Sequence, residues 1–482
     1  MTITRRDFLS SSAAALAIMP TVAGRVYAAP PPRDADVVVI GAGVAGIAAA
    51  RRIAAANRKV LIIEASDTIG GRCITDNTAF DVPFDRGARW LYGADSSPVA
   101  KLARGAGVDM YPAPRGRRVR IGRRNARAGE MEDFLATLVR AHRAVGDTVR
   151  GKPDMPAAAA LPKDLREWTG AVEFLLGAHV TGKDLQDLSA LDLVAMTPRD
   201  APLACRQGLG TLIAKLGAQV PVLLSTPATR VAWSGRDAQV ETSAGKLTAK
   251  AVIITASTNA LLSGKIKFSP ELPKRQQDAV SKLGLGSYDH IALELPGNPM
   301  ELARDDVLIE QSADGRTGLL LANLGGSSLC QIDISGSFGA EMSARGEAAM
   351  VAFAIEWLTK LFGSNVAKHV QRKTATRWND MPYVLGAMSA ASPGGQPARK
   401  ILMEPLGSLF FAGEAAHETQ WGTVNGAWES GERAGDAALR KLSGQKERPV
   451  AERPTKKTRR TSRAAAEAQA PASRSLFFWP RN

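Results

Sequence analysis

Three glycines and one carboxylate near the start of the chain have the types and the spacing of a dinucleotide site. Gly41, Gly43 and Gly46 directly follow an apolar, β-branched run. In that order they supply a tight turn, a bare backbone for a pyrophosphate, and close packing of a helix on a strand. Glu64 ends a second apolar run eighteen residues after Gly46, where a carboxylate accepts hydrogen bonds from ribose hydroxyls. The stretch 36–72 therefore predicts a strand, a phosphate loop, a helix, a strand and a second glycine turn.

NAD and FAD both fit this first unit, and the second glycine turn separates them. Gly70, Gly71 and Arg72 place a cation after two glycines, and together with the phosphate loop this turn resembles the flavin-binding GR2 proteins. FAD is the cofactor that this resemblance implies. Ala45 in the loop and Ala65 beside the acidic residue are counted among its expected contacts.

Length and composition predict a large globular protein with an uneven distribution of charge. The chain has 482 residues, 45% of them hydrophobic, and a formal net charge of +15, which suggests two or three domains. Two basic segments account for most of the charge: residues 115–127 with seven arginines, and the tail from 444. They favour solvated or disordered segments over nucleic-acid binding, because no aromatic residues are interleaved with the cations. Three scattered cysteines give neither a disulfide framework nor the spacing of metal ligands.

Both ends of the chain differ in character from the middle. Residues 1–28 contain Arg5 and Arg6, an alanine-rich apolar run and a small-x-small site, and they resemble a twin-arginine export signal, which predicts a periplasmic location in a bacterium. A membrane anchor is the alternative, but Pro20 interrupts a run that is already too short to span a bilayer. The tail 444–482 has no apolar periodicity and is predicted to be disordered. Docking through its aromatic end stays open.

Apolar periodicity predicts an α/β fold with inserts between the nucleotide motifs. Helices are expected at 130–149, 163–178, 211–216, 271–283 and 340–362. Strands are expected at 222–234, 238–243, 247–257, 288–295 and 318–334. Near the C-terminus an apolar strand, 409–411, precedes Gly413 and Glu414, and a Gly-Thr turn then opens a helix. The N-terminus of that helix can stabilise negative charge on a reduced flavin ring.

Seven ordered blocks between about 36 and 443 resemble the flavin-containing amine oxidase family, which includes monoamine and polyamine oxidases. The blocks are the first glycine unit, Gly70-Gly71-Arg72, DRGARW at 85–90, RQGLG at 206–210, the strand end VIITAS at 252–257, Arg377-Trp378 with Pro382-Tyr383, and FAGE at 411–414 with GTVNGAWESGERAG at 422–435. The resemblance implies a GR2-type, Rossmann-like FAD-binding domain with an inserted α+β substrate domain. The FAD-binding segments would be 33–110, 200–262 and 372–443, and the substrate-binding segments 111–199 and 263–371.

The resemblance also implies which residues contact FAD. Glu64 would take the adenosine ribose, and Arg72 the pyrophosphate and the isoalloxazine edge. Arg230 and Val231 would give backbone contacts to adenine. The expected contacts with the ring system and the ribityl chain are Gly87, Ala88, Arg89, Trp90, Trp378, Gly413, Glu414, Gly422, Thr423 and Val424.

The chain departs from the family pattern at three places. His290 stands where the family has a lysine that holds a water near flavin N5 and is linked with oxygen reactivity. A histidine near its unperturbed pKa of about 6.5 is mostly neutral at pH 7. Met388 and Thr423 stand where many members have two aromatic cage residues, with only Trp421 nearby. Ala387 stands where members with covalent flavin have a cysteine, so the FAD is expected to be non-covalent.

The resemblance implies an FAD-dependent amine oxidoreductase with a small-molecule amine as substrate. The amine would lose a hydride to flavin N5, and the imine would hydrolyse to a carbonyl, with hydrogen peroxide as product if oxygen is the acceptor. The expected catalytic residues are His290, Trp378 and Trp421, with His417 as a weaker candidate and no metal. Two alternatives stay open. One is a flavin dehydrogenase, desaturase or L-amino-acid-type oxidase that uses a periplasmic electron carrier, and the other is a non-catalytic binding subunit. A homodimer also stays open.

Overall fold

The computed structural model describes residues 34–113, 117–199 and 202–445. An eight-stranded sheet in the order β10-β2-β1-β13-β12-β11-β14, with β20 beside β13, holds the nucleotide motifs. Its strands are β1 (Asp34–Ile40), β2 (Val60–Ile63), β10 (Val222–Leu223), β11 (Ala228–Ala232), β12 (Ala238–Thr242), β13 (Gly245–Ile254), β14 (Lys267–Ser269) and β20 (Leu409–Phe411). The strands β10, β2, β1, β13 and β20 are parallel. β1, β2 and the end of β13 are buried and rich in valine and isoleucine, as expected of parallel strands covered on both faces.

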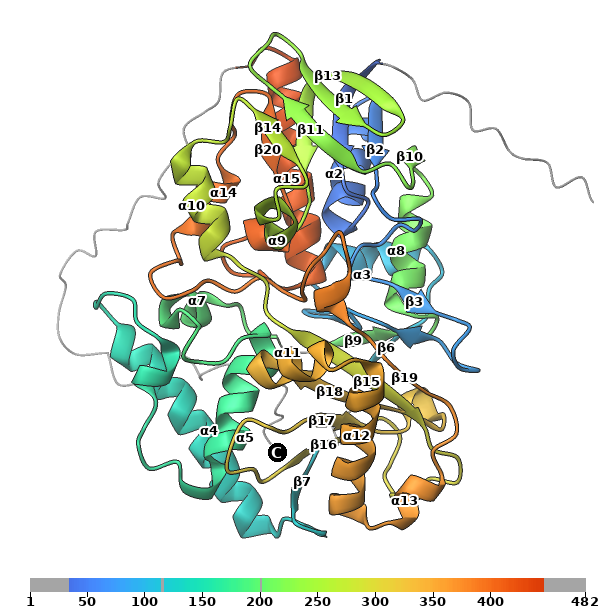
Figure 1. Ribbon diagram of the computed structural model, residues 1–482, viewed down its shortest axis with the longest axis vertical. Helices are drawn as coiled ribbons and strands as arrows, with labels where there is room; N and C mark the ends of the chain where they lie inside the picture. Colours follow the sequence, from blue (N-terminus) through green and yellow to red (C-terminus); the bar gives the residue numbers. More distant parts are fainter. Residues whose placement is uncertain (1–33, 114–116, 200–201, 446–482) are drawn as a thin grey trace, which may run out of the picture. The chain divides into compact units, whose positions relative to one another are not determined.

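Helices cover both faces of this sheet. On one face α2 (Val44–Ala55) packs along α15 (Val424–Leu442), in the upper part of Figure 1. This approach is close, since a Cβ atom added to Gly431 would lie 2.1 Å from the backbone oxygen of Ala45. On the other face lie α10 (Lys274–Lys282) and α14 (Ala398–Met403). The first sheet is thus a buried layer between helices, which is the predicted α/β class.

The second large sheet has seven strands, in the order β19-β15-β18-β17-β16-β7-β8. Its strands are β7 (Arg117–Ile121), β8 (Arg124–Asn125), β15 (Tyr288–Glu294), β16 (Val307–Glu310), β17 (Leu319–Leu321), β18 (Leu329–Ser335) and β19 (Lys373–Ala375). Side chains alternate between its faces. Ile291 and Ile332 pack under α11 (Gly336–Ala344) and α12 (Glu347–Phe362). The residues next to Ile291 along β15 and next to Ile332 along β18 face the opposite side of the sheet.

The region between β8 and β9 is helical. It contains α4 (Ala128–Val149), η1 (Ala157–Ala160), η2 (Arg166–Trp168), α5 (Thr169–Glu173), the π-helix η3 (Phe174–Ala178), α6 (His179–Thr181) and α7 (Ala190–Ala195). The helix predicted at 163–178 therefore exists as a chain of short helices that change type. Gly182, at φ 75°, ends α6.

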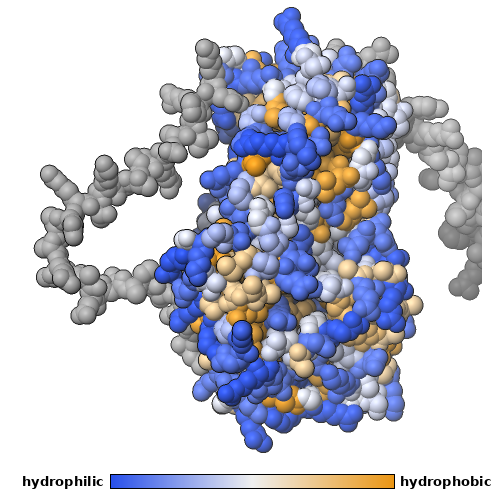
Figure 2. Space-filling view, turned by 60° about the vertical axis from the view of Figure 1, so that its left-hand side comes forward, coloured by the Kyte–Doolittle hydropathy of each residue, from blue (hydrophilic) through white to orange (hydrophobic). Residues whose placement is uncertain are grey.

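Smaller elements complete the described chain. They are β3 (Thr75–Asp76), β4 (Phe84–Asp85), β5 (Trp90–Leu91), β6 (Met110–Pro112), β9 (Leu203–Cys205), α3 (Pro98–Gly105), α8 (Leu209–Gly217), α9 (Thr258–Leu262), α13 (Asn365–Lys368), η4 (Leu324–Gly326), η5 (Trp378–Asp380) and η6 (Glu414–Ala416). In the described part of the chain no helix is both long and apolar enough to cross a membrane. On the face drawn in Figure 2 hydrophobic side chains form separate patches among hydrophilic ones.

Three sequence-based boundaries need correction. β14 adds to the first sheet although it lies after residue 262, and β19 adds to the second sheet although it lies after residue 371. The single helix expected at 340–362 is two helices, because Gly346 at φ 90° separates α11 from α12. The export signal at 1–28 and the tail after 445 lie outside the described residues.

Candidate active site

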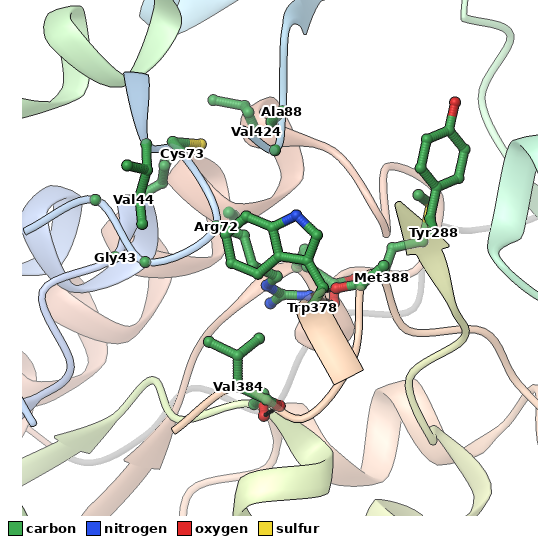
Figure 3. A pocket seen from close by; sticks show the side chains of 18 of the residues that line it. Gly43, Val44, Arg72, Cys73, Ala88, Tyr288, Trp378, Val384, Met388 and Val424 are labelled. Carbon is green, nitrogen blue, oxygen red and sulfur yellow. Dashed lines mark hydrogen bonds and ion pairs between the residues drawn. The ribbon is translucent and has the colours of Figure 1, made fainter. Parts of the chain in front are cut away.

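A cavity of about 1040 Å³ joins the two sheets. It begins at the carboxyl ends of β1 and β2, where ligands bind in open parallel sheets, and it reaches Tyr288 and Asp333 of the second sheet. In Figure 3, Gly43 and Cys73 lie toward one end, Tyr288 toward the other, and Trp378 and Arg72 between them. The cavity therefore connects the predicted nucleotide site to a second group of polar residues.

The phosphate loop has the geometry that its glycines predict. Gly41 has φ 106°, a conformation that favours glycine, and a Cβ at Gly46 would lie 1.9 Å from the backbone oxygen of Gly41. Gly43 precedes α2 and no side chain caps that helix, so the first-turn amides and the helix dipole can serve a phosphate. Gly43 also forms a bridge with Gly70, which brings the second glycine turn against the first. Ala45, Ala65 and Gly71 line the cavity as expected.

Glu64 lies at the cavity wall in a fixed orientation. One carboxylate oxygen accepts a hydrogen bond from the amide of Ala42 at 2.6 Å, and the other accepts two from Ser66, each at 2.9 Å. The carboxylate is therefore held at the end of β2 before any ligand arrives, at the position from which it could meet a ribose.

The prediction for Arg230 and Val231 is wrong, because neither residue lines the cavity. Arg230 is exposed and donates to the hydroxyl of Ser269 at 2.9 Å, whereas Val231 is completely buried in the core. The wall beside Glu64 is formed by residues 226–229, where the amide of Thr226 donates to the backbone oxygen of Glu64 at 2.7 Å. The structure thus places residues 226–229, rather than Arg230 and Val231, at the cavity wall beside Glu64.

Arg72 is fixed beside the cavity by Glu414. Its guanidinium forms an ion pair with Glu414 at 2.8 Å and donates to the backbone oxygen of Ala387. The Glu414 carboxylate also accepts hydrogen bonds from Ser389, through its amide and its hydroxyl, and from the amide of Gly422. Burial alone would raise the pKa of Glu414, but the charge of Arg72, the hydrogen bonds from Ser389 and Arg72, and the charge of Arg399 together outweigh it, so the pKa is lowered. Glu414 lines the cavity as predicted, and it acts by positioning Arg72 and the turn at Gly422.

Trp378 forms a central part of the cavity wall (Figure 3). Its indole donates to the backbone oxygen of Arg86 at 2.8 Å, and its amide donates to Asp289 at 2.8 Å. A Cβ at Gly87 would lie 2.8 Å from the Trp378 ring, so a glycine is needed where the two segments meet. Residues 87–90 all line the cavity.

The C-terminal turn closes the same wall. Gly413, Gly422, Thr423 and Val424 line the cavity as predicted. Thr423 caps α15, because its hydroxyl oxygen accepts a hydrogen bond from the amide of Gly426 at 3.0 Å. The N-terminus of a nineteen-residue helix therefore points toward the cavity, where its dipole favours negative charge.

Two predicted catalytic residues lie elsewhere. Trp421 is completely buried, and the guanidinium of Arg399 stacks on its ring at 4.4 Å. His417 pairs with Glu429 at 3.0 Å and accepts hydrogen bonds from two backbone amides. Neither side chain lines the cavity, whereas Met388 does. The prediction for Trp421 is wrong because the chain reverses at Gly422 and directs the tryptophan into the core.

His290 lies in the cavity wall with hydrogen-bond partners for both ring nitrogens. Nδ1 is 2.6 Å from a carboxylate oxygen of Asp333, and Nε2 is 3.0 Å from the backbone oxygen of Gly87. Burial alone would lower the pKa of His290, but the charge and the hydrogen bond of Asp333 raise it above its ordinary value. The expectation of an unperturbed histidine is therefore corrected: the pKa of His290 lies above its ordinary value, because Asp333 and the backbone oxygen of Gly87 favour the protonated ring.

A polar group around His290 was missed by sequence reasoning. Tyr288 donates to Asp333 at 2.7 Å, and its hydroxyl oxygen is 3.1 Å from Nδ1 of His179. Burial lowers the pKa of His179 to about 4, so its ring is neutral. Arg199, from the segment after α7, lines the same region. One signal could have indicated Asp333: the alternating polar residues within the apolar strand LCQIDIS, which mark a polar face.

Comparison with known proteins identifies the family. The family model described as flavin containing amine oxidoreductase matches residues 44–204 and 121–439. The chain is 26% identical over 468 residues to polyamine oxidase 4 of Oryza sativa subsp. japonica, covering 89% of this chain and 92% of that protein. It is 27% identical over 435 residues to lysine-specific histone demethylase 2 of Homo sapiens, covering 83% of this chain but only 52% of that protein.

Solved structures agree in fold. Cyclohexylamine oxidase from Brevibacterium oxydans IH-35A superimposes with a TM-score of 0.71 at 21% identity, covering 85% of this chain and all of that one. Wild-type putrescine oxidase bound to putrescine gives 0.72 at 18% identity, covering 84% and 99%. At these identities the likeness shows the fold alone. Because the family model matches the chain from residue 44, at the start of α2, to residue 439, beyond the turn at Gly422, the chain belongs to the flavin-containing amine oxidoreductases, which use FAD.

Proposed function

We propose that the cavity binds FAD and an amine side by side and that the chain oxidises the amine to an imine. When bound, FAD accepts the hydride that leaves the α-carbon of the substrate. The amine nitrogen loses a proton, and water hydrolyses the resulting imine to a carbonyl compound and ammonia or an amine. The observation that carries this proposal is the continuity of one cavity from the phosphate loop to the polar group on the second sheet.

The residues present fit an FAD molecule. The uncapped first turn of α2 and the fixed Glu64 suit a pyrophosphate and a ribose. Arg72 and the N-terminus of α15 supply positive potential at the far part of the same wall. Residue 387 is an alanine, whereas members with covalent flavin have a cysteine there, and this supports a non-covalent cofactor. In this proposal the first sheet belongs to the FAD-binding domain. The second sheet and the helices from α4 to α7 belong to the substrate-binding domain.

Oxygen is the proposed electron acceptor, with hydrogen peroxide as product. The raised pKa of His290 favours a positive charge where the family resemblance expects a lysine, which supports oxygen reactivity. A periplasmic carrier protein is the second candidate, and the absence of an aromatic pair at Met388 and Thr423 favours it. We further propose a bacterial, exported enzyme, on the basis of Arg5, Arg6 and the apolar run that follows.

Purified protein is expected to contain about one FAD per chain, released by heat or acid, and the FAD should bleach when an amine is added without oxygen. Admitting oxygen should restore the colour and consume oxygen. No bleaching across a broad set of amines would refute the amine-oxidising function. Bleaching without oxygen consumption would favour the carrier, and flavin that stays on the denatured chain would refute non-covalent binding.

A further inference from the structure

Arg199 is a buried cation at the part of the cavity where a substrate amine would approach. The residue is 9% exposed, and a Cβ added to Gly422 would lie 3.0 Å from its Nη2 and 3.5 Å from Cβ of Met388. Its guanidinium carbon is 5.7 Å from the ring centre of Tyr92. Arg199 thus lies beside the two positions, Met388 and the Gly422 turn, at which the family resemblance led us to expect aromatic residues.

The positive charge of Arg199 has no carboxylate partner among the described residues. Nη1 donates to the backbone oxygen of Val180 at 2.8 Å and Nη2 to that of Trp421 at 3.4 Å. Both acceptors are neutral, and so is the hydroxyl of Tyr92, with which the Arg199 side chain is also hydrogen-bonded. The Nε atom is buried and has no acceptor in the described part of the chain. Nε does not face the cavity, so a ligand could reach only the Nη atoms; a buried guanidinium whose acceptors are all neutral is costly unless a ligand supplies an anion.

The neighbouring charges do not neutralise Arg199. The Asp333 carboxylate already accepts from His290, from Tyr288 and from Gln331 at 2.6, 2.7 and 2.7 Å, and the charge of His290 balances it. Burial keeps His179 neutral near pH 7.

A second arginine, Arg117 of β7, lines the same cavity. Burial lowers its pKa to about 9, which leaves it mostly charged at neutral pH. Arg117 and Arg199 therefore place two guanidinium groups on the wall of the same cavity. A diamine or another multiply cationic amine would meet repulsion there.

We propose that the substrate is an amine that carries a carboxylate, in the class of amino acids, and that Arg199 binds this carboxylate through its guanidinium. The proposal rests on the proposed function, because it names the substrate class of the same cavity. A guanidinium presents donors in a planar fork that matches a carboxylate. The same contact would hold the substrate beside Met388 and Gly422, next to the wall that contains Trp378 and Arg72.

Matched ligands test the proposal directly. Leucine, phenylalanine and lysine should each be compared with the amine that remains after loss of the carboxyl group, by anaerobic mixing with the FAD-loaded protein. Each amino acid is expected to reduce the flavin at least tenfold more efficiently than its partner amine. Separately, 4-methylpentanoate, which has leucine's carboxylate but no amine, should perturb the flavin absorbance on binding.

Three variants identify Arg199 as the cause. Arg199→Gln should weaken 4-methylpentanoate binding at least tenfold and remove the preference for amino acids, while Arg199→Lys should keep part of both. Arg123→Gln removes one exposed arginine in the turn between β7 and β8 and should change neither. FAD content and melting temperature show whether each variant is folded. If Arg199→Gln does not fold, Arg199→Lys and the comparison of each amino acid with its partner amine on the wild-type protein still test the proposal.

The possible outcomes distinguish a failure of this inference from a failure of the proposed amine-oxidising function. Reduction by simple amines but not by amino acids would overturn the inference and leave the amine-oxidising function intact. Carboxylate binding that is unchanged in Arg199→Gln would also overturn it. If no amine and no amino acid reduces the flavin, the function fails, and Arg199-dependent binding of 4-methylpentanoate would still support a carboxylate site.

Discussion

At the scale of single residues, the protonation of His290 has a measurable consequence for the reaction with oxygen. Its raised pKa extends the range of pH over which the ring is cationic, and a cation about 4 Å from a developing negative charge is worth about 4 kcal/mol at an effective dielectric constant of about 20. His290→Gln should therefore slow flavin reoxidation roughly tenfold or more, with a smaller effect on anaerobic reduction. Stopped-flow traces of the two half-reactions measure this.

The raised pKa of His290 also determines the direction in which flavin reoxidation changes with pH. Wild-type reoxidation should be fastest well below the raised pKa of His290 and should slow as the pH rises through it. In unfolding experiments the stabilisation from His290 should be complete below about pH 6.5, the ordinary pKa, and should be lost as the pH rises through the raised one. His417→Gln, outside the cavity, serves as the control. Equal oxygen rates in wild type and His290→Gln would mean that this charge does not govern the step.

Glu64 gives a second prediction at this scale. Glu64→Ala removes charge-assisted hydrogen bonds to a ribose, each worth about 1.5–3 kcal/mol, and leaves the amide of Ala42 without its acceptor. FAD occupancy at dilute cofactor should fall while the fold persists. A titration followed by flavin fluorescence measures the affinity. Glu132→Ala, on the exposed face of α4, should bind FAD like wild type, and equal affinities of the two variants would rule out the ribose contact.

At the scale of elements, the contact between α2 and the phosphate loop depends on Gly46. A methyl group there would lie 1.9 Å from the backbone oxygen of Gly41, so Gly46→Ala must push the helix away from the loop. We expect a loss of about 1–3 kcal/mol in the free energy of unfolding, together with weaker FAD binding. The control is Gly146→Ala within α4, where no atom lies within 4 Å and a gain of about 0.5–1 kcal/mol is expected. Urea titrations of both variants test the contrast.

The elements also show which parts of the site a sequence can predict. The phosphate loop, the Gly87 segment and the turn at Gly422 are local motifs, in which neighbours along the chain are neighbours in the site. Asp333 and His179 are different, because a strand pairing and a π-helix bring them together from distant segments. Arg230 and Trp421 were misassigned for a related reason: within a strand or a tight turn, a shift of one or two residues moves a side chain from a cavity to the core or the surface.

At the scale of the whole molecule, a buried ion pair joins α7 of the helical region to α14 beside the first sheet. Arg399 and Asp192 are completely buried and form two hydrogen bonds of 2.7 Å. Arg399→Met should cost about 3–5 kcal/mol of stability, because it leaves Asp192 unpaired, whereas Arg399→Met with Asp192→Leu should cost less. Thermal unfolding of the FAD-loaded protein measures both.

An exposed ion pair provides the comparison for that prediction. Arg52 and Asp436 are 2.6 Å apart with side chains that are 50% and 39% exposed, so Arg52→Met should cost about 0–1 kcal/mol. If Arg399→Met is no more destabilising than Arg52→Met, the buried pair does not hold the two regions together.

Export is also a property of the whole chain. Replacing Arg5 and Arg6 with lysine should keep the protein in the cytoplasm of an exporting bacterial host, because the proposed machinery reads the arginine pair. Cell fractionation with an activity or flavin readout measures the distribution. A periplasmic yield equal to that of the unmodified chain would contradict the proposed export route, and a Lys215→Arg variant in α8 controls for effects of substitution alone.

The order of the strands has a consequence for how the protein is made. β1 and α2 leave the ribosome early, but β20 and α15, which pack against β13 and α2, end only at Leu442. At about 5–20 residues per second, α2 waits roughly 20–80 s for its partner. During this interval the side of α2 that packs on α15 has no native cover, so the nascent chain needs protection from association. The FAD site is completed only after nearly the whole described chain has been synthesised, and cofactor capture must follow translation.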